Sequence, residues 1–158
     1  MQGLLSRFML VSLLGLTVMA GSVALASTLD EARAEGEQTG GGRIIAAGVT
    51  DVVGLVQDRR GHLYAASQAT GEVFCVPPTG ATLVLAQVPG EPTSLAVSRS
   101  RTVFVGTQSG MVYGVLPDGS VVEACRVDGP ATGLAVDRDG ALMVATPGGV
   151  VVRVACEY

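Results

Sequence analysis

The chain has 158 residues, which is enough for one domain and a targeting segment. Its formal net charge is −4 and all its basic residues are arginines, so nothing in the charge balance indicates a nucleic-acid-binding protein. There is no lysine, asparagine or tryptophan, and His62 is the only histidine, which excludes most routes to catalysis through an imidazole, an amine or an amide.

Residues 1–26 have the pattern of a secretory signal peptide. Arg7 precedes an apolar run over 8–26 that ends in the small-residue triplet Ala24-Leu25-Ala26. We therefore expect cleavage after Ala26 and export to the periplasm or the extracellular space. The other interpretation is an uncleaved membrane anchor, because the apolar run is just long enough to cross a bilayer.

Residues 27–41 are predicted to form a flexible linker. This segment is acidic, has few large apolar residues and ends in three consecutive glycines. Such a composition buries too little apolar surface to fold by itself.

The rest of the chain is organised around a repeated segment, found at 53–67, 93–107 and 132–146. In each copy a short apolar strand runs into a polar turn and then into a second apolar strand, which predicts a β-hairpin. Equivalent leucines at 55, 95 and 134 lie 40 and 39 residues apart. A period near 40 with about four strands is typical of a β-propeller blade.

Extending the repeat outward gives three units, 42–81, 82–120 and 121–158. Each unit is predicted to begin with the outermost strand of a four-stranded sheet, the first of these being Arg43 to Ala47. That strand would complete a blade whose other three strands lie at the C-terminus. The strands are nearly continuous apolar runs, so both faces of each sheet are predicted to be buried. The fold class is therefore all-β, a β-propeller of about three blades.

The segment GLAVDRDGALMVAT, residues 133–146, resembles the repeat of NHL-type propellers and of the six-bladed senescence-marker/gluconolactonase-like family. The resemblance covers residues 42–158 and implies a propeller. It does not define an activity, because this fold hosts lactonases, other hydrolases, lyases and binding modules.

Three blades are half of a six-bladed ring. Propellers have about four to eight blades, so three would leave two bare sheet faces. A homodimer with twofold symmetry would close the ring. The alternative is that the sequence is a fragment of a larger propeller, and both interpretations stay open.

One set of loops is predicted to surround the mouth of the central channel. Its hydroxyl, amide and acidic side chains are candidate ligand-binding residues: Thr50, Asp51, Gln68, Glu91, Thr93, Gln108 and Thr132. Asp51 and Glu91 share a repeat position, where the resemblance implies carboxylates that bind a divalent cation such as calcium. The third equivalent is Pro130, and the alternative is that both acids only form turns, with no cofactor.

The hairpin turns are predicted to lie at the opposite end and to carry five arginines: Arg59, Arg60, Arg99, Arg101 and Arg138. One interpretation is an anion-binding or docking surface. The other is a set of solvated turns, because aspartates are interleaved with the arginines. His62 is expected to be structural or exposed.

The chain has three cysteines, an odd number for an exported protein. Cys75 is expected to pack as a small apolar residue, and a bridge between Cys125 and Cys156 stays open.

The sequence thus favours an exported propeller that serves as a binding or assembly module without evident catalytic machinery. The alternative is a metal-dependent hydrolase of the gluconolactonase-like kind, active only as an assembled ring. A further alternative is a remnant that folds poorly.

Overall fold

The structure is a computed structural model that describes residues 38–39, 42–43 and 45–155. The chain divides into two units, residues 1–47 and 48–158. In the first unit, β1 (Gln38–Thr39) pairs with β2 (Gly42–Arg43) in an antiparallel hairpin. The predicted signal peptide and residues 27–37 and 40–41 of the predicted linker lie outside the described residues.

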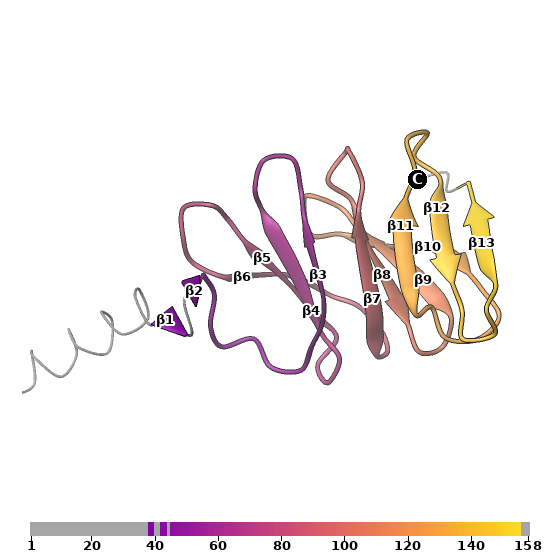
Figure 1. Cartoon of the computed structure of the whole chain (residues 1–158), viewed down its shortest axis with the longest axis horizontal. Coiled ribbons are helices and arrows are strands. Elements are labelled where there is room, and N and C mark those ends of the chain that lie inside the picture. The colour runs from indigo at the N-terminus through magenta and orange to yellow at the C-terminus, as the bar shows by residue number, and fades with distance from the viewer. Residues whose placement is uncertain (1–37, 40–41, 44, 156–158) are drawn as a thin grey trace, which may run out of the picture. The chain divides into compact units, whose positions relative to one another are not determined.

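Residues 48–155 form three antiparallel sheets that lie side by side (Figure 1), and we call them the first, second and third blade. The first blade contains β3 (Val52–Gln57), β4 (Leu63–Ser67), β5 (Glu72–Val76) and β6 (Leu83–Gln87). The second contains β7 (Pro92–Val97), β8 (Val103–Thr107), β9 (Met111–Val115) and β10 (Val121–Arg126). The third contains β11 (Gly133–Val136), β12 (Leu142–Ala145) and β13 (Val151–Val154). The predicted all-β, propeller-type architecture is confirmed.

The outermost strand of a blade comes from the following repeat, as predicted. β6 lies in the unit 82–120 yet pairs with β5, and β10 lies in the unit 121–158 yet pairs with β9. The prediction of a first outer strand from Arg43 to Ala47 is wrong for this structure. Gly42 and Arg43 bond to β1, whereas residues 45–50 form no strand and Ile45 is 65% exposed. A strand is stable only when a neighbour completes its hydrogen bonds, and no described strand pairs with residues 45–47.

Two apolar seams join the blades. The buried residues of the first seam, between the first and second blades, are Tyr64, Ala66, Val73, Val88, Leu95, Val103, Val105 and Val115. Those of the second seam, between the second and third blades, are Ala96, Phe104, Val112, Val127, Ala131, Leu142 and Val144. β8 serves both seams, because its successive side chains point to opposite faces.

Small residues let the blades approach at these seams. A Cβ placed on Gly54 of β3 would lie 3.2 Å from Cδ1 of Leu95, so the leucine packs directly on the glycine backbone. At the second seam, Thr93 Oγ1 donates to the carbonyl of Ala131 at 2.7 Å, and Ser94 Oγ donates to the same carbonyl. Each seam therefore contains a specific contact that fixes how one blade sits on the next.

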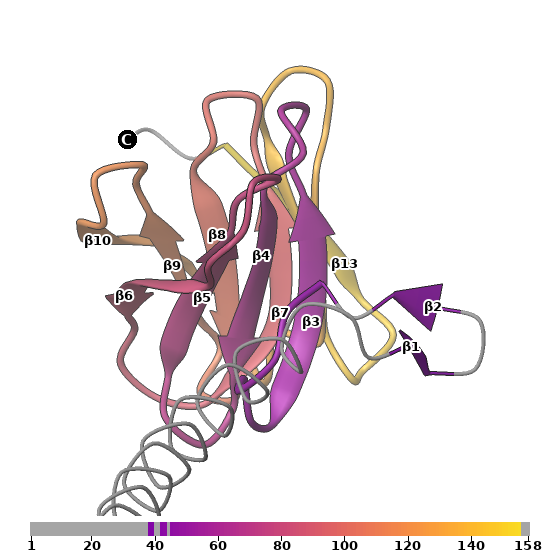
Figure 2. The same cartoon turned by 90° about the vertical axis from the view of Figure 1, so that its left-hand side faces the viewer.

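The outward faces of the first and third blades differ from the seams, so the prediction of burial on both faces holds fully only for the second blade. Leu55 of β3 is 63% exposed, whereas Leu95 at the same repeat position is 7% exposed. Across the first blade, Ala65 and Phe74 are buried while Val84 at the outer margin is exposed. Figure 2 looks onto this side of the blade. In the third blade, Val150, Val151 and Val152 are exposed.

No helix in the described part of the chain is long and apolar enough to cross a membrane.

Candidate functional site

The antiparallel strands sort the loops of the blades into two ends. The turns after β3, β7 and β11 lie together at the top of Figure 1, and we call this the hairpin-turn end. The loops that precede those strands, together with the turns after β4, β8 and β12, lie at the other end, the channel-mouth end. The two ends carry different side chains and are considered in turn.

At the channel-mouth end, Asp51 and Glu91 occupy equivalent positions. The backbone N–H of Gln68 donates to the backbone carbonyl of Asp51, and the backbone N–H of Gln108 donates to that of Glu91, both at 2.9 Å. Asp51 has a φ of 49°, in the left-handed region that aspartate tolerates in turns. The side chains of these four residues are exposed.

The threonines of this end divide between two roles. Thr93 Oγ1 donates to the carbonyls of Gly106 and Ala131, and Thr132 Oγ1 donates to the carbonyl of Ala145. Both hydroxyls therefore hold neighbouring backbone in place. Thr50 is exposed beside Asp51.

The carboxylates of one chain do not fit a calcium site. Among residues 38–39, 42–43 and 45–155, no group of three or more His, Cys, Asp or Glu side chains lies close enough to hold a metal ion. Calcium takes about six to eight oxygen ligands. A metal at Asp51 and Glu91 would need ligands from outside the described chain.

At the hairpin-turn end, three turns are built on one plan. Asp58 Oδ1 accepts the amide N–H groups of Arg60 and His62 at 2.8 and 2.9 Å. Asp137 Oδ1 accepts those of Asp139 and Ala141 at the same distances. In the middle turn, Ser98 Oγ accepts the Thr102 N–H at 3.0 Å. Short polar side chains that close a turn in this way are the reason Asp and Ser occur there.

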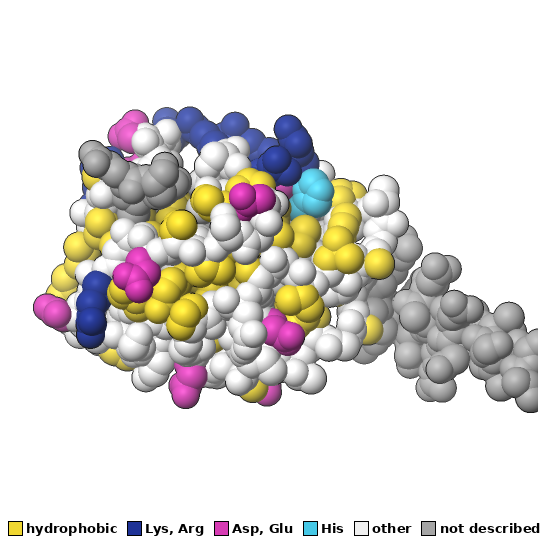
Figure 3. Space-filling view, turned by 180° about the vertical axis from the view of Figure 1, so that it is seen from behind, with side chains coloured by type: hydrophobic (Ala, Val, Ile, Leu, Met, Phe, Trp, Pro, Cys, Tyr) yellow, Lys and Arg dark blue, Asp and Glu magenta, His cyan; other side chains and the backbone are white. Residues whose placement is uncertain are grey.

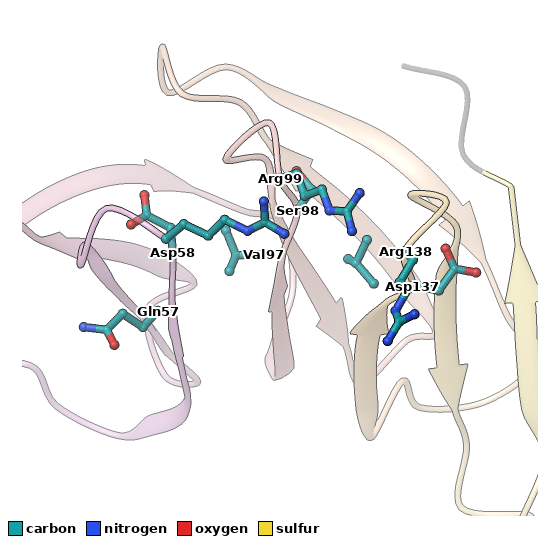
Figure 4. A pocket seen from close by; sticks show the side chains of 9 residues that line it. Gln57, Asp58, Val97, Ser98, Arg99, Asp137 and Arg138 are labelled. Carbon is teal, nitrogen blue, oxygen red and sulfur yellow. The ribbon is translucent and has the colours of Figure 1, made fainter.

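Each of these turns places an arginine directly after its closing residue: Arg59, Arg99 and Arg138. Between the turns lies a hollow of about 270 Å³ (Figure 4), lined by one triplet from each blade: Gln57-Asp58-Arg59, Val97-Ser98-Arg99 and Val136-Asp137-Arg138. Figure 4 shows Arg99 extending from its turn toward the third blade, which carries Arg138. Figure 3 shows arginine side chains in a row along this edge of the molecule.

The aspartates of this end already have partners. Asp58, whose side chain is 2% exposed, also accepts the Tyr64 hydroxyl at 3.4 Å and lies 3.1 Å from Nδ1 of His62. Burial alone would raise the pKa of Asp58, but the backbone N–H groups of His62 and Arg60 and the nearby imidazole hold it below its usual value. Burial raises the pKa of Tyr64 to about 12.

Asp137 and Asp139 are engaged by the third blade's own arginine. Arg153 of β13 lies 2.6 Å from Asp137 and 3.5 Å from Asp139. Desolvation acts to raise the pKa of Asp137, but the hydrogen bond from Arg153 and those from two amides lower it.

The guanidinium groups of the hollow remain unpaired. Arg59, Arg99 and Arg138 make no hydrogen bond or ion pair through their side chains to the described residues. Three of the five predicted arginines thus line one hollow, whereas Arg60 and Arg101 lie on the same end outside it. Sequence reasoning missed the contacts of Tyr64 and Arg153; a tyrosine and an arginine in apolar strands were the only signal.

His62 is structural, as expected, since it closes the first turn with Asp58. Cys75 is a free thiol that packs against the first seam, and burial raises its pKa. Cys156 lies outside the described residues, so a bridge to Cys125 stays a prediction.

No protein-family model and no curated protein sequence matches the chain. Solved structures do. The WD40 β-propeller domain of Doa1 matches with a TM-score of 0.58 and 17% identity over 68% of this chain and 38% of that one. A putative gluconolactonase matches with a TM-score of 0.58 and 17% identity over 68% and 46%. Virginiamycin B lyase from Staphylococcus aureus matches with a TM-score of 0.51 and 14% identity over 65% and 40%.

These likenesses show that the chain has the β-propeller fold. The match spans less than half of each of these solved chains. The identities are too low to transfer a substrate or a partner.

Proposed function

We propose that this chain is an exported, non-enzymatic propeller module whose function is binding and assembly, and that its first assembly partner is a second copy of itself. The observation that supports this most is a match between its two outward faces. One offers the exposed Leu55 and the other offers the partly exposed Gly133, at the positions that pack together inside the chain.

The first seam provides the pattern. There Leu95 of the second blade packs on Gly54 of the first. The repeat places Leu55 at the position of Leu95 and Gly133 at the position of Gly54. Leu55 is exposed, and a Cβ on Gly133 would meet only Cβ of Ala145, 3.3 Å away. A second copy related by a twofold axis would bring Leu55 against Gly133 at both new seams.

Two further features support closure with another set of blades. The third blade has three described strands where the other two have four, so the outer edge of β13 is unpaired in the described chain. Unpaired edges and apolar faces promote association. The matched part is also less than half of each solved propeller reported above.

The molar mass of the mature chain in solution tests the proposal. Light scattering coupled to gel filtration should give twice the chain mass for the wild type. Leu55→Glu should give the mass of a single chain, because it places a charge in the seam. Leu83→Glu is the matched control: Leu83 is 56% exposed, but it pairs across the sheet with Cys75, on the face opposite Leu55. A well-folded wild-type monomer, or equal effects of both variants, overturns the proposal.

A deletion separates two modes of closure. Removing the residues up to Ala47 leaves the seam residues intact but removes the segment that was expected to pair with β13. An unchanged dimer indicates face-to-face docking alone, whereas a weakened dimer indicates that this segment is exchanged between copies.

The second candidate is a metal-dependent hydrolase, favoured by the equivalent backbone bonds of Asp51 and Glu91. Two copies would bring four carboxylates to one channel mouth.

The assembled protein would then retain calcium in fixed stoichiometry. Asp51→Asn would release this calcium, whereas the control Asp118→Asn, at an exposed turn elsewhere, would not. An assembled but calcium-free ring removes this candidate; chelator-sensitive turnover of lactones would replace the non-enzymatic proposal.

A further inference from the structure

We propose that the hollow at the hairpin-turn end binds a small polyanion, a ligand with several phosphate or sulfate groups, through Arg59, Arg99 and Arg138. This site lies in the single chain and does not depend on the proposed assembly.

The local structure makes these three arginines available. In each turn the residue before the arginine is Asp58, Ser98 or Asp137. Its side-chain oxygen accepts hydrogen bonds from backbone N–H groups of the turn. The turn is thereby fixed without help from the arginine, and the guanidinium is left without a partner in the described chain. The same arrangement occurs in all three blades, at one repeat position.

The aspartates that line the hollow do not bind its three arginines. The carboxylate of Asp58 is buried among its donors, and that of Asp137 is paired with Arg153 at 2.6 Å. Arg153 therefore neutralises the aspartate that would otherwise compete with a ligand for Arg138.

The charge of the blades is also sorted by end. The hairpin-turn end carries Arg59, Arg60, Arg99, Arg101, Arg138 and Arg153 against Asp58, Asp118, Asp137 and Asp139. The channel-mouth end carries Asp51, Glu72, Glu91 and Asp128 against Arg126, and Glu123 lies in the middle of β10, between the two ends. One end of an acidic protein is thus positive, and such a field attracts anions.

The geometry favours a ligand with more than one anionic group. The three guanidiniums come from three blades around one hollow of about 270 Å³, which is the size of a small molecule rather than of a protein segment. Guanidinium groups bind phosphate and sulfate oxygens through paired hydrogen bonds. Ser98 and Gln57 add neutral polar groups, and Val97 and Val136 line the hollow beside them.

Calorimetric titration at constant ionic strength tests the site with two small probes that each carry three anionic groups, inorganic tripolyphosphate and glycerol trisulfate. The wild type should bind at least one of them, and the tighter probe identifies the preferred group. Arg59→Gln, Arg99→Gln and Arg138→Gln should each weaken binding about tenfold, the size of a hydrogen bond to a charged group. Arg60→Gln, on the same turn but outside the hollow, and Arg126→Gln, at the other end, should change it less than about twofold.

A second measurement locates the probe. The side-chain Nε–H resonances of Arg59, Arg99 and Arg138 should shift on titration, whereas those of Arg60 and Arg126 should not. The side chains of these five arginines make no hydrogen bond or ion pair to the described residues, so the variants should unfold at the wild-type temperature. The proposal is overturned if the wild type binds neither probe, or if the control variants lose as much affinity as the hollow variants.

Discussion

Leucines at one repeat position lie in two environments, and truncating them should have different consequences. Leu95 is 7% exposed and packs on Gly54, so Leu95→Ala should lower the free energy of unfolding of the chain by about 3 kcal/mol through lost burial and a cavity. Leu55 is 63% exposed, so in a single chain Leu55→Ala should cost less than about 1 kcal/mol.

Assembly changes this expectation. If a second copy covers Leu55 as fully as Leu95 is covered, more than half of its surface leaves water on docking, which contributes about 1 to 2 kcal/mol per side chain. A twofold dimer has two such contacts, so Leu55→Ala should weaken its dissociation constant by roughly a hundredfold.

Urea unfolding followed by circular dichroism at several protein concentrations gives the first quantity, and sedimentation equilibrium gives the second. Leu55→Ala should be nearly silent in dilute protein and increasingly costly in concentrated protein. The reasoning is refuted if Leu55→Ala costs as much as Leu95→Ala at every concentration, or if the dimer's dissociation constant is unchanged.

Other substitutions test the single chain. Gly106→Ala should cost about 1 to 3 kcal/mol, because its Cβ would lie 2.5 Å from Ser94 Oγ, and prior Ser94→Ala should reduce that cost; Gly148→Ala, with nothing within 4 Å, is the control in chemical denaturation. Arg101 has a φ of 70°, in the left-handed region, where the other two turns have glycine. Arg101→Gly should therefore raise the free energy of unfolding by about 1 kcal/mol and raise the midpoint of thermal unfolding; a lower midpoint would contradict this. The lowered pKa of Asp58 means that its ionised form contributes stability above about pH 4, which is lost as the pH falls through the folded-state value. Asp58→Asn should therefore destabilise the protein near neutral pH and flatten the fall of unfolding free energy in acid; equal acid slopes would count against it.

Much of the fold could be predicted from the sequence because its determinants are local and repeated. The hairpins follow from apolar runs separated by turn residues. Interpreting the period near 40 as a propeller blade predicts that β6 and β10 belong to the preceding blades, which their pairing confirms. The segment 45–47 could not be predicted in the same way. It has the same apolar character as those strands, but whether it pairs depends on an edge supplied from elsewhere.

The candidate site could be predicted from the sequence only in part. Composition and strand order placed five arginines at one end, but which three share a hollow depends on how the seams bring the turns together. The pairing of Arg153 with Asp137 depends on the register between β12 and β13, which sets a residue 16 positions away beside the turn. Neither fact is encoded in a short motif.

The outer strands β6 and β10 belong to the following repeats, and this has a consequence for the synthesis of the chain. The ribosome delivers β3, β4 and β5 first, yet the first sheet closes only after β6 has emerged, when the following repeat is already under way. The edge of the first blade, like that of the second, is therefore hydrogen-bonded only after the first strand of the following repeat has been made. A chain whose emerged part ends near Ser120 would hold a finished first sheet and a second one whose β9 edge is still open, and that edge would be available for pairing with a neighbouring chain.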